Sequence, residues 1–484
     1  MAESSEEGGR PQTDLQSRAS DHSSNEDYAD SDADDGETAA DRLDESLIRR
    51  SDEESDGSGA HSSSSGDDED RQRNIHRRSQ MLSTMTFDTS MPSSHSYLGE
   101  TRSAAEGVAL VGIVREDDAV PDLPVVSLHD IVLFPGQTLP LTLTRPAAMR
   151  AITALLEDGS SRRLLLVVNP RVIDAERALR VGTTGEIRSY RKTTDALHVV
   201  VLGRQRVKLV GTPVLQPSGI LTSTAHILPE PLPPRMPLDV MGTPAPHSCS
   251  RPSGAVACIT QGQASPSSSS AQRGVKAWRG AGSAYWPRWC YAMFDAETLA
   301  RQARARFQVL TGMDHAPARG TGASGDCGQA AAAAPHEPLA FSYWLSWNLL
   351  VGARDRQKLL ECSVVERLRN QLHILKGMGA LACTRCGLPI CHHEQLFHMS
   401  SEGPVSAFVN PGGVVHETAT FYKASNLVLV GPKSEEHSWF PGYAWTIALC
   451  AGCQGHIGWR FTAVSALAVP RHFWGLSRAQ LRQG

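Results

Sequence analysis

Two cysteine pairs in this chain have the spacing of metal ligands. Cys383 and Cys386 form one CxxC pair, and Cys450 and Cys453 form a second, with 63 residues between the pairs. Each CxxC turn presents two thiolates, and four thiolates satisfy the tetrahedral coordination that zinc prefers. Because four thiolates leave no open position, the pattern predicts one structural Zn²⁺ ion that activates no water. A redox dithiol and unpaired core cysteines remain alternatives.

The absence of membrane and secretion signals indicates the compartment. The chain has ten cysteines, lacks an apolar run of the roughly 20 residues that a bilayer crossing needs, and begins without a secretion-signal pattern. We therefore expect a cytoplasmic and nuclear protein without a disulfide framework.

The run Cys391–His393 could compete for the metal, but adjacent residues rarely converge on one ion. We expect it on the surface or in the core.

Aromatic residues concentrate around the second cysteine pair. Four of the nine tryptophans lie in the last 46 residues: Trp439, Trp445, Trp459 and Trp474. Tryptophan is well buried on average, so the pattern alone is compatible with an ordinary core as well as with a binding pocket. We find no nucleophile and base pair in these segments.

These segments resemble the ligand-binding domain of the cereblon family. The matching stretches are Val409–Pro411, Val415–Thr418, Glu436–Thr446 and His456–Ala463. In that family three tryptophans form a cage for a cyclic imide, either the glutarimide of thalidomide-type drugs or a cyclised carboxy-terminal Asn or Gln. The resemblance implies a ligand site whose members are Asn410, Pro411, Glu436, His437, Ser438, Trp439, Trp445, Trp459 and Phe461.

The resemblance also implies a role for each part of this cage. Trp439, Trp445 and Trp459 would form the walls and Phe461 the base, while backbone groups of His437 and Trp439 would pair with the imide. Asn410 and Pro411 would lie across the mouth. Gly412 departs from the family, which commonly has a histidine at this rim position, so we expect weaker contacts to a recruited protein.

The region before the zinc module is expected to be rich in strands. Short runs of branched apolar residues punctuated by Gly and Pro predict six strands. They are Val125–Leu128, Thr138–Leu143, Leu164–Val168, Gly185–Ser189, Leu197–Leu202 and Arg206–Val210. Pro146 at a first turn, followed by apolar residues at helical spacing up to Leu156, predicts one helix among them.

This strand-rich region resembles the amino-terminal domain of Lon proteases, which recognises substrates and carries no catalytic residue. Leu128–Leu141, Gly182–Ile187 and Leu202–Val207 carry that resemblance. Phe87–Gly99, upstream, is similar to the segment that precedes this domain in the cereblon family.

Two helices are expected between the strand-rich region and the zinc module. One presents a face made of Trp289, Met293, Ala296, Ala300, Ala303 and Phe307, and the other runs from Arg356 to Lys376 with leucines at helical spacing. Trp286–Ala300 and Val365–Leu375 resemble cereblon-family helices that dock on the DNA-damage-binding adaptor of a cullin-RING ligase. The stretches 241–282 and 312–355 depart from the family pattern.

Composition completes the domain prediction. The first 70 residues hold 23 acidic and five basic residues, a net charge of −18, which leaves about +13 for the remainder. We expect a disordered acidic tail (1–80) and a Lon-amino-terminal-like region (120–377). That region comprises a β unit (120–236), a linker or insertion (237–284) and adaptor-binding helices (285–377). A zinc-stapled β domain (378–484) follows, so the predicted fold is mixed and mostly β.

Four classes of function compete on these observations. The leading interpretation is a non-catalytic substrate receptor of a cullin-RING ubiquitin ligase, with the adaptor, imide-bearing substrate proteins and small glutarimides as partners. A diverged form that binds ligand but not the adaptor is the alternative. An ATP-dependent protease would need a GxxxxGK[ST] loop, which is absent. A zinc-stapled sulfoxide reductase would need a further reactive thiol, but no cysteine follows Cys453. Direct nucleic-acid binding is not expected, because the basic-aromatic run typical of RNA binding is missing.

Overall fold

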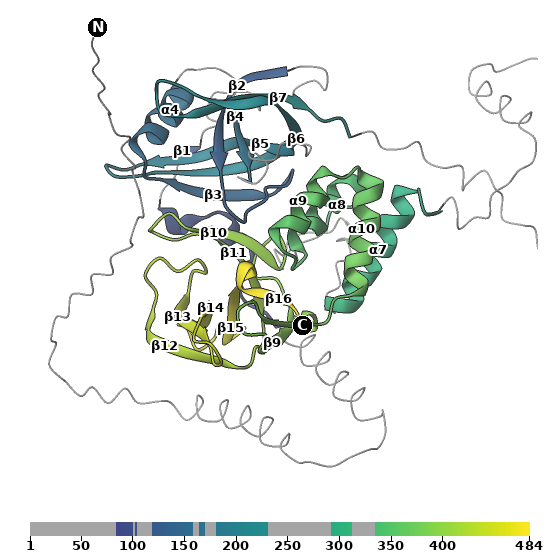
Figure 1. Ribbon diagram of the computed structural model, residues 1–484. Coiled ribbons are helices and arrows are strands. Elements are labelled where there is room, and N and C mark those ends of the chain that lie inside the picture. Colours follow the sequence, from purple (N-terminus) through teal and green to yellow (C-terminus); the bar gives the residue numbers. More distant parts are fainter. Residues whose placement is uncertain are drawn as a thin grey trace, which may run out of the picture. The chain divides into compact units, whose positions relative to one another are not determined.

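The computed structural model describes residues 84–99, 102–103, 119–157, 164–169, 181–230, 292–311 and 334–484 (Figure 1). The predicted acidic tail (1–80), the predicted linker (237–284) and the tryptophans at 286 and 289 lie outside these residues. Within them the fold is mixed and rich in strands, as predicted. None of the described helices combines the length and the apolar character that a membrane crossing requires.

Seven strands form the first sheet, in the order β1-β5-β4-β2-β7-β6-β3, with β5 also paired to β6. They are β1 (Arg102–Ser103), β2 (Ala119–Ser127), β3 (Thr138–Leu143), β4 (Leu164–Val168), β5 (Val181–Lys192), β6 (Leu197–Leu215) and β7 (Leu221–Ile227). β2 and β4 pair in parallel, while the other pairs are antiparallel. Helix α4 (Pro146–Glu157) buries Ile152 and Leu156 in the core with Leu139, Leu165 and Val199.

The strand prediction was accurate for β3 and β4 but incomplete for β6 and β7. The two runs predicted at 197–202 and 206–210 are parts of one long strand, β6. Gly203 lies between them within the strand. Glycine is required there because a Cβ at this position would lie 2.2 Å from the carbonyl oxygen of Phe134. Strand β7 was missed, because Leu221–Ile227 is rich in threonine and serine and has little branched apolar character.

Four longer helices follow: α7 (Ala296–Thr311), α8 (Pro338–Asn348), α9 (Ala353–Glu361) and α10 (Val364–Lys376). The predicted face of α7 is buried at Ala296, Ala300, Ala303 and Phe307, but Met293 precedes the helix and is exposed.

The single helix predicted at 356–376 was wrong, since two helices meet at Cys362 and Ser363. A capping box between Ser363 and Glu366 begins α10. Helix α8 was not predicted. It is buried on nearly every side, so its apolar residues show no helical stripe.

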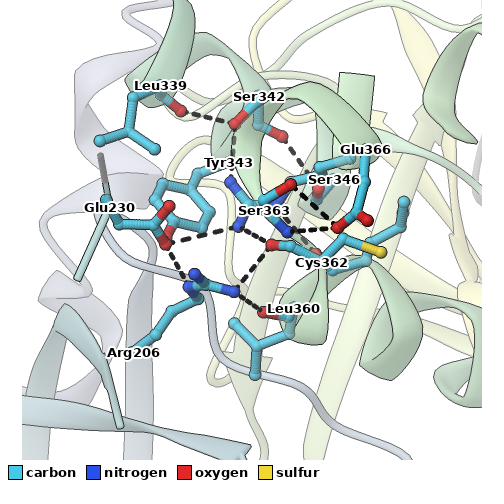
Figure 2. A network of polar contacts seen from close by, with 12 residues as sticks. Arg206, Glu230, Leu339, Ser342, Tyr343, Ser346, Leu360, Cys362, Ser363 and Glu366 are labelled. Carbon is cyan, nitrogen blue, oxygen red and sulfur yellow. Dashed lines mark hydrogen bonds and ion pairs between the residues drawn. The ribbon is translucent and has the colours of Figure 1, made fainter. Parts of the chain in front are cut away.

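A buried polar network holds the first sheet against these helices (Figure 2). Glu230, which follows β7, pairs with Arg206 of β6 and with Arg367 of α10, and it accepts a hydrogen bond from the Tyr343 hydroxyl of α8. Arg206 Nη1 also donates to the carbonyl oxygens of Leu360 (2.6 Å) and Cys362 (2.7 Å). Burial is the main cause that raises the pKa of Tyr343, so its hydroxyl stays protonated and able to donate.

The last hundred residues form two antiparallel sheets. A six-stranded sheet has the order β10-β11-β15-β14-β13-β12, and a three-stranded sheet has the order β16-β8-β9. The strands are β8 (Ala380–Cys383), β9 (Pro389–His392), β10 (Val405–Val409), β11 (Val415–Phe421), β12 (Leu427–Ser434), β13 (Tyr443–Cys450), β14 (His456–Ala463), β15 (His472–Ser477) and β16 (Leu481–Gln483).

A second buried ionic cluster joins β11 to the helices. Glu417 of β11 accepts hydrogen bonds from Arg356 Nη1 of α9 (2.6 Å) and from Arg478 Nη1 after β15 (3.4 Å). The second nitrogen of Arg356 donates to the Asp130 carbonyl oxygen (2.7 Å), and that of Arg478 donates to the Trp347 carbonyl oxygen. The cluster therefore ties the first sheet, the helices and the carboxy-terminal sheet together at one point.

Candidate functional site

The four predicted metal ligands converge at one place. Cys383 and Cys450 end strands β8 and β13, and Cys386 and Cys453 stand in the turns that follow. All four Sγ atoms lie within 4.8 Å of one another, with 3.7 Å between those of Cys383 and Cys453 and 3.5 Å between those of Cys386 and Cys450. A tetrahedral ion with Zn–S bonds of about 2.3 Å would set the sulfur atoms about 3.8 Å apart. The cluster therefore fits one structural zinc with four sulfur ligands.

The competing run at Cys391–His393 is not part of this cluster. Among the described residues, the group that meets the metal-site geometry consists of the four cysteines. Cys391 is buried in β9 and His392 is exposed. His393 is buried and its Nδ1 lies 2.7 Å from the Gly379 carbonyl oxygen. These residues thus take the core and surface places expected of them.

A cavity of about 630 Å³ opens over strands β13 and β14. Eight of the nine predicted ligand residues line it, and three lining residues were not predicted. The complete lining is Asn410, Pro411, His416, Glu436, His437, Trp439, Trp445, Ile447, His456, Trp459 and Phe461. Its size is within the usual range for small-molecule sites.

Strand register explains why aromatic side chains share this cavity. In the antiparallel pair of β13 and β14, Trp445 lies opposite Phe461 and Ile447 lies opposite Trp459. Directly opposite residues project from the same face of a sheet, and residues two apart on one strand do so as well. All four side chains therefore point to one side of the sheet.

Trp439 completes the aromatic wall from a loop. Its ring centroid lies 4.7 Å from that of Trp459, with the planes at 73°, an edge-to-face arrangement. Behind it, the ring of Phe408 stacks on Trp439 at 5.0 Å with the planes 8° apart. The indole nitrogen of Trp445 donates to the Glu436 carbonyl oxygen (2.9 Å), which joins this loop to β13.

Ser438 is the predicted ligand residue that does not line the cavity. Its hydroxyl donates to the carbonyl oxygen of Tyr443 (2.6 Å) and lies 3.2 Å from that of Phe440, so it closes the loop from inside. His437, next to it, has a left-handed backbone with φ of 54° and an exposed side chain. The loop thus turns sharply at the point where its backbone passes the cavity.

Two histidines were missed as lining residues. His416 and His456 each contact the Trp459 ring edge to face, at 5.1 Å and 4.7 Å between centroids. Burial lowers the pKa of both imidazoles below 6.5, and their proximity lowers that of His416 further. Both belonged to matching stretches, but only their ring contacts with Trp459 in the folded chain show that they face the cage.

The mouth of the cavity is formed by the tight β10–β11 turn. Asn410 accepts a hydrogen bond from the Val414 amide at its Oδ1 (2.8 Å), and its own amide donates to the Val414 carbonyl oxygen (3.0 Å). Pro411 and Gly412 are exposed at the tip. Gly413 has φ of 82°, a conformation that favours glycine.

Comparison with known proteins decides the family. The chain is 34% identical to protein cereblon of Danio rerio over 405 residues, and this stretch covers 82% of this chain and 88% of the relative. It belongs to the cereblon family. Protein cereblon of Gallus gallus is also 34% identical, over 415 residues that cover 82% of this chain and 85% of the relative. Protein cereblon of Drosophila pseudoobscura pseudoobscura is 27% identical over 422 residues, 82% of this chain and 59% of that protein.

Two parts of this cereblon-family chain each match a known domain family. Residues 122–236 match the substrate-binding domain of ATP-dependent protease La (LON). Residues 380–483 match a family described as Yippee zinc-binding/DNA-binding/Mis18, centromere assembly. The resemblances inferred from sequence to the Lon and cereblon families are thereby confirmed, and the match at 380–483 supports the zinc assignment to the four-cysteine cluster.

The segment before the first sheet packs behind the cage. Phe87 contacts Tyr443 edge to face at 5.5 Å and lies 6.4 Å from Phe440, measured between ring centroids. The Tyr97 hydroxyl accepts a hydrogen bond from the Val409 amide (3.1 Å), one residue before Asn410. Phe87–Gly99, the stretch that resembles the cereblon family, therefore supports both the back of the cage and the strand that leads to its mouth.

Proposed function

We propose that this chain is the non-catalytic substrate receptor of a cullin-RING ubiquitin ligase and that its cage binds cyclic imides. The observation that carries the proposal is the cavity lined by Trp439, Trp445 and Trp459 in a cereblon-family chain. Ubiquitin transfer would be performed by other subunits of the ligase.

The chemistry of the cavity suits a flat and weakly polar ring. Trp439 and Trp459 offer indole surfaces at 73° to each other, so one face and one edge of a small ring can be covered together. The loop backbone from Glu436 to Trp439 supplies N–H and C=O groups beside these rings, which an imide N–H and two carbonyls require once water is expelled. Burial lowers the pKa of His416 and of His456, which favours their neutral forms and suits an uncharged ligand.

Titration of the full chain with a glutarimide compound tests the cage. We expect the intrinsic tryptophan fluorescence to change saturably and calorimetry to give one site per chain. The matched control is the same compound methylated on the imide nitrogen, which loses the N–H donor and gains bulk where the fit is closest. Equal binding of both compounds, or binding of neither, would contradict the proposed ligand class.

The helices are proposed to dock on the DNA-damage-binding adaptor of the ligase. Helix α7 carries an exposed apolar side chain at Val309 (68% exposed), and Phe294 just before the helix is 47% exposed. Apolar residues placed outward suit a protein contact. Co-purification with the adaptor tests this, and Val309→Asp should weaken capture while imide binding stays unchanged. A chain that binds imide but never captures adaptor would be the diverged form that is the alternative.

A further inference from the structure

Strand β12 is one of the two edge strands of the six-stranded sheet, and β10 is the other. Strand β12 pairs with β13 on one side, and in the described part of the chain no strand pairs with its other side (Figure 1). An edge strand exposes backbone N–H and C=O groups that can accept a further strand. We propose that β12, from Leu427 to Val430, receives an extended segment of the substrate protein whose cyclised terminus occupies the cage. The inference rests on the proposed function.

The side chains of β12 favour a strand as the occupant. Val428, Leu429 and Val430 are consecutive, apolar and exposed by 41%, 39% and 45%. Consecutive strand residues project from opposite faces, so this apolar surface lies on both sides of the edge. A helix or globule resting on one face would leave the other side uncovered. An added strand covers both and satisfies the free backbone groups.

The register makes this edge continuous with the cage. Val430 lies opposite Ile447, and Ile447 lies opposite Trp459. These three side chains project from one face, and the last two line the cavity. Neighbouring strands are about 4.8 Å apart, so the outer side of β12 lies about 14 Å from β14. Four extended residues span that distance at about 3.5 Å each.

The end of β12 limits where a strand can pair. Its register with β13 shifts between Val430 and Ser434, and Gly431 has φ of 84°. Pro432 has no N–H to offer, and Lys433 is exposed. Such features protect an edge from pairing. The pairing segment is therefore Leu427–Val430, and about eight residues before the imide are needed to cross from the cage and pair along it.

The test compares two probes that share the same terminal aminoglutarimide, one with two preceding residues and one with ten alternating Val and Thr. Four added cross-strand pairs should make the long probe bind about tenfold more tightly. Leu429→Lys should remove most of this gain and leave the short probe unchanged, because Leu429 projects from the face opposite to the cage. The matched control is Val464→Lys, an exposed valine just beyond the inner strand β14, which should preserve both affinities.

The outcomes separate the two proposals. If the short probe binds and the long probe binds no more tightly, the strand proposal is overturned and the cage proposal stands. If neither binds, the cage proposal fails and this inference fails with it. Methylation of alternate peptide nitrogens in the long probe should weaken binding at every second position, whereas a uniform effect would exclude strand pairing. Self-association that Leu429→Lys abolishes, without any gain for the long probe, would assign the edge to a second copy of the chain.

Discussion

Replacing Trp459 by alanine is the sharpest test of the cage. The Trp459 ring lies within 5.1 Å of three other rings, those of Trp439, His416 and His456, measured between centroids. Its removal would delete one wall and the surface that holds both histidines in place. For a central aromatic residue this costs about 2 kcal/mol of binding free energy. That loss corresponds to an affinity for a glutarimide about 30-fold weaker.

Trp474 provides a matched control within the same sheet. It lies opposite Arg460, whereas Trp459 lies opposite Gly475, so the two indoles project from opposite faces. Trp474→Ala should lower the unfolding temperature and leave the glutarimide affinity within about twofold. Binding is measured by calorimetry, and zinc content confirms that each variant is folded. An unchanged affinity in Trp459→Ala, or an equal loss in folded Trp474→Ala, would show that the pocket has been misplaced.

Three further predictions concern the metal, a buried ion cluster and a buried histidine. Elemental analysis should find about one zinc per chain. Cys383→Ser should lose the bound zinc and unfold the carboxy-terminal domain, whereas the control Cys362→Ser should keep the zinc. A Cys383→Ser protein that is folded without metal would refute the site. Glu417→Gln leaves two buried arginines without a counter-charge and should lower the free energy of unfolding by about 3 kcal/mol or more. Lys358→Ala breaks only an exposed pair and should cost under about 1 kcal/mol, so equal effects would contradict this reasoning. Burial lowers the pKa of His393 to about 4, so the unfolded chain binds its proton first as the pH falls below 6.5. Between pH 7 and pH 5 the free energy of unfolding of the wild type should therefore fall by about 2 kcal/mol more than that of His393→Gln. Urea denaturation measures both pH profiles, and parallel profiles would contradict this role of His393.

Short-range patterns predicted the parts of the fold that depend on neighbours in sequence. Strands Thr138–Leu143 and Leu164–Val168 and the helix beginning at Pro146 follow from local apolar spacing and turn residues. Local patterns did not predict elements whose residues are buried on all sides. Helix α8 presents no polar face that would reveal its period, and Gly203 marks the close approach to the Phe134 carbonyl oxygen and not the end of a strand.

The cage divides in the same way between sequence and structure. The sequence by itself determined the four cysteine ligands, because a CxxC turn is local and thiolates select the metal, and it marked the three tryptophans through family resemblance. Only the tertiary structure decided that His416 and Ile447 join them, since His416 of β11 meets the Trp459 ring of β14, and Ile447 lies opposite Trp459 in the β13–β14 pair. The same holds for Glu417, whose buried carboxylate is stable only beside arginines 61 residues away in either direction. Spacing along the chain cannot encode such pairs, because packing of the whole sheet against the helices brings them together.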